Sequence, residues 1–245
     1  MTTSGEEDKL VQNARTMEFQ QLDLNSNVTF PSTKYNFPQE LNVKITKKPI
    51  IVCDPSAIGV CSLAMVCLMV CMSSFGATST PVVLQAPWII VLSGFLMLIA
   101  GIVDAFRRNI FGAVVFVMYA TFWLALGCAQ FATHFGSEDD VEGGAQHSGA
   151  AVFGYIIFNF SCILISLSLN KILFYIMVAI EFVLVFLTLE LLEGTPSWPT
   201  GLFLLITSLL SFYYCFANLI NHLAGGDLIC VGKPIFLWSS LVQKK

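Results

Sequence analysis

Charged residues are scarce in this chain of 245 residues, of which Asp, Glu, Lys and Arg make up 11%. Average soluble domains carry roughly 25%. Hydrophobic residues account for 56% of the chain, and the mean hydropathy is +0.77. A soluble fold of this composition would expose large apolar patches and associate, and a net charge of -4 does not suit a nucleic-acid-binding protein. The composition therefore predicts an integral membrane protein with no nucleic-acid partner.

The residue patterns of catalysis and of cofactor binding are also missing. Cys and His do not occur at metal-ligand spacing, and the chain has no glycine-rich phosphate-binding loop. The three histidines, at positions 134, 147 and 222, are far apart in the sequence. We therefore expect no enzyme activity, no metal site and no cofactor.

Long apolar segments begin only after residue 50. Each holds about 18–22 residues, which is the length that crosses a hydrocarbon core near 30 Å. We predict an all-α fold with six transmembrane helices over 51–226, between a cytoplasmic polar N-terminal tail (1–50) and a cytoplasmic C-terminal tail (227–245). The six segments cover roughly 58–75, 86–103, 110–131, 150–169, 172–192 and 201–219. The acidic segment 137–142 is expected to be a solvated loop on the outer side.

The positions of the basic residues predict the orientation. All twelve lie in the N-terminal tail, the C-terminal tail, the second-to-third loop (Arg107 and Arg108) and the fourth-to-fifth turn (Lys171). The other three loops contain none, and basic residues favour the cytoplasmic side. Both termini are therefore expected in the cytoplasm, as an even number of helices also requires. We expect a multi-pass protein of the plasma membrane rather than of an organelle.

Polar residues recur at helical spacing inside three of the apolar segments. Such stripes act either as interhelical hydrogen-bond contacts or as the lining of a polar path, and three stripes in one chain favour a path. Asp54-Pro55 is expected to cap the first helix. The stripes are Gly112, Phe116, Tyr119 and Trp123 in the third segment, Tyr155, Asn159, Cys162 and Ser166 in the fourth, and Thr207, Ser211, Tyr214, Asn218 and His222 in the sixth.

Glu181 is the acidic residue near the middle of a predicted membrane segment, at about the tenth of its 21 positions. A lone carboxylate there costs a few kcal/mol on insertion scales. The functional interpretation is proton coupling or substrate sensing. The structural interpretation is a protonated or hydrogen-bonded Glu at a subunit contact.

Three stretches resemble the acetate uptake transporters, a family that includes bacterial acetate–succinate permeases and fungal acetate and ammonia-export proteins. Asn109-Ile110-Phe111-Gly112 with Phe116, Tyr119 and Phe122-Trp123 reproduces the family pattern N-x-F-G-x-x-x-F-x-x-Y-x-x-F-W. Ala100–Asp104 resembles the end of the family's second helix, and Asp54–Gly59 resembles its signature N-P-A-P-L-G. The resemblance runs from about Asp54 to Gly232.

The resemblance implies a homohexamer in which each six-helix protomer carries its own carboxylate path through a constriction near mid-membrane. Carried over by position, the constriction is Leu63, Tyr119 and Ile180, and Asp54 helps to form the cytoplasmic vestibule. A tyrosine hydroxyl that offers one donor would lower the barrier for a carboxylate at such a dry neck. The alternative for Tyr119 is a buried aromatic residue with a satisfied hydroxyl.

The chain departs from the family pattern at several positions. Asp54 stands for the signature Asn, Ala57 for its second Pro, and Met97 for a common glutamine of the second helix. We expect a transporter or channel for small monocarboxylates such as acetate, with protons, the lipid bilayer and copies of itself as partners. A non-transporting membrane scaffold and a pore for ammonium or another small solute are the alternatives. Further pathway and coupling candidates, beside Asp54 and Glu181, are Trp123, Asn159, Thr207, Ser211 and Asn218.

Overall fold

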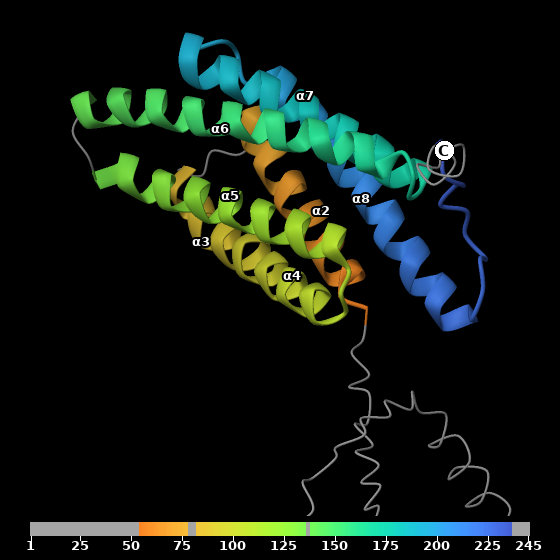
Figure 1. Cartoon of the computed structure of the whole chain (residues 1–245). Coiled ribbons are helices and arrows are strands. Elements are labelled where there is room, and N and C mark those ends of the chain that lie inside the picture. Colours follow the sequence, from red (N-terminus) through yellow and green to blue (C-terminus); the bar gives the residue numbers. More distant parts are fainter. Residues whose placement is uncertain (1–53, 78–81, 136–137, 237–245) are drawn as a thin grey trace, which may run out of the picture. The chain divides into compact units, whose positions relative to one another are not determined.

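The computed structural model describes residues 54–77, 82–135 and 138–236. Over these residues it is all-helical, and it contains six helices long and apolar enough to cross a membrane (Figure 1). With the labels of Figure 1, the elements are α2 (Ser56–Ser74), η1 (Val82–Gln85), α3 (Ala86–Trp88), η2 (Ile89–Phe95), α4 (Leu96–Phe106), α5 (Ile110–Phe135), α6 (Glu138–Ser166), α7 (Lys171–Glu193) and α8 (Trp198–Ala224). The predicted fold class and the six spans are confirmed. The tail 1–50 lies outside the described residues.

Polar side chains begin several helices, as expected from the sequence. The Asp54 Oδ1 accepts a hydrogen bond of 2.9 Å from the backbone N–H of Ser56. The Asn170 Oδ1 accepts one of 2.8 Å from the Leu173 N–H at the start of α7. At the other end of α7, Gly194 adopts the left-handed conformation with φ of 64°, which glycine tolerates without a Cβ penalty. These caps define the short turns between spans.

Two helices differ from the sequence expectation. α6 begins at Glu138, and the acidic segment forms its first turns. The prediction that this segment is a loop is therefore wrong. The second span is also not a regular helix. It passes through a π-helical stretch at Ile89–Phe95 before α4 begins.

The helices pack in pairs along the chain and across it. α4 packs along α5, α6 along α7, and α8 packs against both α2 and α7 (Figure 1). Ser208 links the first and last spans, because its Oγ donates a hydrogen bond of 2.7 Å to the Ala64 carbonyl. Glycine permits a close approach of α4 and α5, where a Cβ on Gly101 would lie 2.7 Å from the Val117 side chain.

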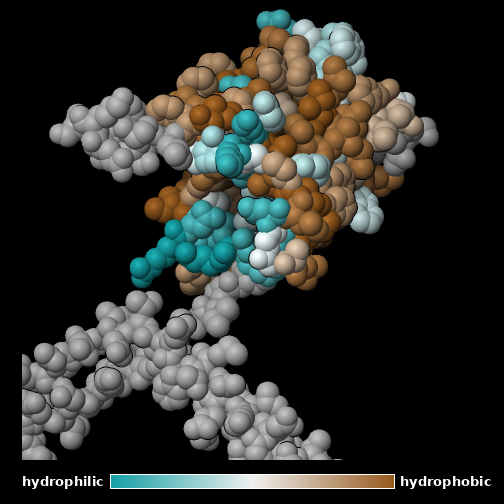
Figure 2. All heavy atoms as spheres, turned by 90° about the vertical axis from the view of Figure 1, so that its right-hand side faces the viewer, coloured by the Kyte–Doolittle hydropathy of each residue, from teal (hydrophilic) through white to brown (hydrophobic). Residues whose placement is uncertain are grey.

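The outer surface of this bundle is apolar along its length. Many large hydrophobic side chains are exposed on the single chain, for example Phe160 on α6 and Leu209 on α8. Figure 2 looks at the bundle end where α4 and α8 finish and shows hydrophilic residues gathered there, with hydrophobic residues on the flanks. Such a surface suits lipid or other apolar partners rather than water.

Candidate functional site

A cavity of about 180 Å³ lies inside the bundle at one end. Its polar lining comes from the beginnings of three helices, where Ser56, Asn109 and Asn170 lie. We call this end of the bundle the Asn109 end. The rest of the lining is mostly apolar, and none of the described residues that line it is charged. The volume has room for several waters or for one small organic molecule.

A second cavity of about 20 Å³ lies next along the bundle. Leu63 and Tyr119 line both cavities, and Ile180 lines the smaller one. All three are buried, at 5%, 2% and 5% exposure. Leu63 and Tyr119 therefore lie at the boundary between the two spaces, and Ile180 lies in the wall of the smaller one. We call this boundary the neck.

The stripe in the third segment lies along both cavities. Gly112, Phe116 and Tyr119 line the larger one, and Trp123 lines the smaller one. Trp123 is buried, and its Nε1 has no hydrogen-bond partner within the described part of the chain. The atoms that line the smaller cavity are apolar, so this buried donor does not face it, and the smaller cavity is the drier of the two.

A chain of hydrogen bonds extends from the neck across three helices. The Tyr119 hydroxyl donates to the Asn159 Oδ1 at 2.6 Å. The Asn159 Nδ2 in turn donates to the Met177 carbonyl at 2.9 Å and to the Glu181 Oε2 at 2.7 Å. Asn159 is fully buried, whereas Glu181 is partly exposed and lines neither cavity. Among the described residues, Asn159 is the one that links Glu181 to Tyr119 by hydrogen bonds.

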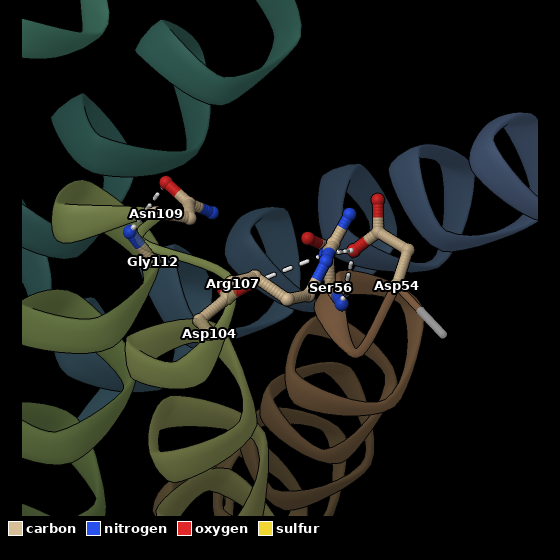
Figure 3. A network of polar contacts seen from close by, with 6 residues as sticks. All are labelled: Asp54, Ser56, Asp104, Arg107, Asn109 and Gly112. Atoms are coloured by element: carbon tan, nitrogen blue, oxygen red, sulfur yellow. Dashed lines mark hydrogen bonds and ion pairs between the residues drawn. The ribbon is translucent and has the colours of Figure 1, made fainter. Parts of the chain in front are cut away.

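Asp54 takes part in a second polar network, at the Asn109 end (Figure 3). The Arg107 Nη1 lies 2.7 Å from the Asp54 Oδ1 and 3.3 Å from the Asp104 Oδ1. Asp104 is fully buried, and its Oδ2 has no hydrogen-bond partner among the residues described. The sequence did not single out Asp104 or Arg107 as a pair, although their i, i+3 spacing on one helix allows it.

The charges of this network shift the ionisation of its outer members. Partial burial raises the pKa of Asp54, but the hydrogen bonds from Ser56 and the Arg107 guanidinium outweigh it and lower the pKa below its ordinary value. The pKa of Arg107 is raised, chiefly by its hydrogen bond to Asp54. Both groups are therefore ionised at neutral pH, and the ion pair joins the start of α2 to the end of α4.

Of the remaining candidates, which belong to the sixth segment, one lines a cavity and the others do not. Thr207 lines the smaller cavity and donates its hydroxyl to the Phe203 carbonyl at 2.8 Å. Ser211 is buried and lines neither cavity, and its Oγ has no partner among the described atoms. Asn218 also lines neither cavity. Tyr214, which belongs to the same stripe, lines the larger one.

The arrangement of six apolar helices around two internal cavities defines the class as an integral, multi-pass membrane protein. A solved structure described as the bacterial acetate channel SatP has the same fold. The TM-score is 0.68 at 18% sequence identity, and the match covers 74% of this chain and 100% of that one. At that identity the likeness establishes the fold alone.

Sequence similarity places the chain in a family. Residues 37–224 match the GPR1/FUN34/yaaH family, and the chain belongs to it. This confirms the resemblance to acetate uptake transporters, although the match begins at residue 37, within the tail that was expected to lie outside it. No curated protein is significantly similar to the chain in sequence.

Proposed function

We propose that this protein carries small monocarboxylates such as acetate across a membrane, together with protons. The neck is the observation that carries this proposal, because it separates two internal cavities with one tyrosine and apolar side chains. Membership of the family and the fold shared with an acetate channel support the substrate class. A dry neck of this kind makes passage depend on size and on the cost of desolvation.

The Asn109 end is the proposed entrance for the carboxylate. Three helix N-termini meet there, at Ser56, Asn109 and Asn170, and the positive ends of helix dipoles favour anions. Arg107 lies at the same end but is paired with Asp54 and Asp104, so the helix N-termini supply the positive potential of the proposed entrance. In the proposed orientation this end faces the cytoplasm, with both termini on that side and the protein in the plasma membrane.

The proposed working form is a homo-oligomer, and the family resemblance favours a hexamer. Glu181 supports an assembled form because it is partly exposed on the single chain at the middle of a membrane span. A carboxylate in contact with lipid at that depth is costly. A neighbouring copy packed against α7 would cover it.

Uptake of labelled acetate into proteoliposomes tests the proposal. Vesicles that contain the protein should take up acetate faster than protein-free vesicles, and an inward proton gradient should increase the difference. Tyr119→Ala should change the rate, because it removes the neck's polar side chain, while a retained elution profile shows that the variant folds. Uptake equal to that of protein-free vesicles, from correctly folded protein, would refute transport of acetate and favour a scaffold.

A further inference from the structure

We propose that Asn159 holds the Tyr119 hydroxyl so that the neck accepts a hydrogen bond and therefore passes the neutral, protonated acid rather than the carboxylate. This inference rests on the proposed function and specifies where the transported proton resides. It assigns Asn159 as a positioning residue, because it acts on the substrate through Tyr119. It differs from the donor role that the sequence suggested for the tyrosine.

The direction of the Tyr119 proton follows from the Met177 backbone. A carbonyl oxygen can only accept, so the Asn159 Nδ2 must face the Met177 carbonyl, from which it lies 2.9 Å. The amide oxygen then faces Tyr119 at 2.6 Å and can only accept in turn. The tyrosine proton is therefore directed at Asn159, whether or not Glu181 is ionised.

This arrangement is difficult to reverse during passage. Asn159 is fully buried, so turning the Tyr119 hydroxyl toward a passing anion would leave the amide oxygen buried without a donor, which is unfavourable. The phenol oxygen instead retains a lone pair for the substrate. A carboxylic acid or an amide can donate to that lone pair, whereas a carboxylate cannot.

The surroundings of the neck also disfavour an anion. None of the described residues that line either cavity carries a charge, so an anion at the neck would lack a counter-charge. Met97, in place of the family's glutamine, adds a thioether to the wall of the larger cavity. Beyond the neck, the atoms that line the smaller cavity are apolar, which costs a charged solute far more than a neutral one.

Glu181 has a different part in this scheme from that of a proton carrier. It lines neither cavity, and Asn159 separates it from Tyr119. Its carboxyl oxygen accepts a hydrogen bond of 2.7 Å from the Asn159 Nδ2 and so helps to orient that amide. The proton that accompanies the substrate then arrives on the substrate itself, through ionisation equilibrium in the larger cavity or in solution.

Neutral and permanently charged analogues distinguish the two mechanisms. Proteoliposomes with the full chain are given labelled acetamide, acetate or methanesulfonate, with protein-free vesicles as the background, and charge movement is recorded on a supported membrane. We expect acetamide uptake above background and no current with either anion. Above the substrate's pKa, near 4 to 5, acetate uptake should fall about tenfold per pH unit as the acid fraction falls.

Three variants and one matched control distinguish a positioning role of Asn159 from a structural one. Asn159→Leu frees the Tyr119 hydroxyl to donate, so methanesulfonate uptake should rise about tenfold relative to acetamide uptake. Ser161→Leu is the matched control, since Ser161 is an exposed residue of the same helix whose hydroxyl, within the described part of the chain, donates to the Ile157 carbonyl one turn earlier. Tyr119→Phe removes the acceptor and should lower acetamide uptake without creating anion current. Glu181→Gln keeps an acceptor for Asn159 and should retain stimulation by the proton gradient.

The outcomes separate this inference from the proposed function. Wild-type acetate uptake that is accompanied by a current reversing at the acetate equilibrium potential would overturn the inference and leave transport intact. Unchanged selectivity in Asn159→Leu would also overturn it. Absence of both acetate and acetamide uptake from folded protein would overturn the proposed function itself.

Discussion

Gly112 is the residue at which a single added methyl group should disturb the architecture around the larger cavity. A Cβ at this position would lie 2.0 Å from the Asp104 Oδ2 and 2.6 Å from the Asn109 Nδ2. Asp104 is fully buried and is held by Arg107 at 3.3 Å, so its carboxylate cannot simply swing into solvent. Gly112→Ala therefore forces α4 and α5 apart or displaces Asp104 from Arg107.

The size of the effect follows from two opposing terms. Overpacking a buried site costs about 1–3 kcal/mol, and the rigid carboxylate places Gly112→Ala in the upper part of that range. Replacing a helical glycine by alanine returns about 1 kcal/mol. The net loss of unfolding free energy is about 1–2 kcal/mol, which corresponds to a fall in Tm of about 2–8 °C for a chain of this length.

Gly154→Ala provides the matched control, because Gly154 is helical and exposed in α6 and a Cβ there would meet nothing within 4 Å. Far-UV circular dichroism during heating in one detergent should show a lower Tm for Gly112→Ala and an unchanged or higher Tm for Gly154→Ala. In the double variant with Asp104→Ala the losses should not add, since the clash partner is gone. A wild-type Tm for Gly112→Ala would refute the reasoning.

Three further changes test the path and its entrance. Leu63→Ala should join the two cavities, and the loss of a buried side chain should lower the free energy of unfolding by about 2–5 kcal/mol. It should raise uptake of propionate relative to acetate. An unchanged uptake ratio would contradict the proposal that the neck limits the size of the solute. Trp123→Phe shortens a side chain in the apolar wall of the smaller cavity and should also raise uptake of propionate relative to acetate; a wild-type ratio would show that the smaller cavity does not select by size. Asp54→Asn should lower Tm slightly at neutral pH, because an exposed ion pair with Arg107 contributes under about 1 kcal/mol. The folded pKa of Asp54 is lowered from 3.8, so this contribution is complete above pH 3.8 and is lost as the pH falls through the folded pKa. The Tm difference between wild type and variant should therefore vanish in acid. A Tm difference independent of pH would contradict the pairing.

Hydropathy predicted the six spans because each is apolar over a length that crosses a bilayer, and helices in soluble cores are rarely apolar over such a length. The ends were predicted less well. α6 begins at Glu138 rather than near residue 150, and this start was not predicted because a run of acidic residues is equally compatible with a solvated loop and with the first turns of a helix. The π-helical stretch at Ile89–Phe95 was not predicted, because its residues are as apolar as those of a regular helix and hydropathy does not distinguish hydrogen-bond registers.

The stripe of α5 could be predicted from spacing alone, since Gly112, Phe116 and Tyr119 repeat at helical intervals and line one cavity. The partners of Tyr119 could not. Its bond to Asn159 joins residues 40 apart in the sequence, and the bond from Asn159 to Glu181 joins residues 22 apart. Such contacts depend on which helices pack together and in what rotation. The sequence contains both polar stripes but not their relative rotation.

The scarcity of charge acquires a physical meaning once the charges are placed. Asp54, Asp104 and Arg107 cluster at the Asn109 end, and Glu181 lies behind Asn159. None of them lines either cavity. A charge inside the path would bind an oppositely charged solute tightly and slow its release, whereas conduction requires sites that are weak enough to leave. The charges of this chain instead hold helix ends and orient the buried Asn159 amide, so they shape the neck without binding the solute. A neutral acid is the form of the substrate that crosses such a neck at the lowest cost in desolvation.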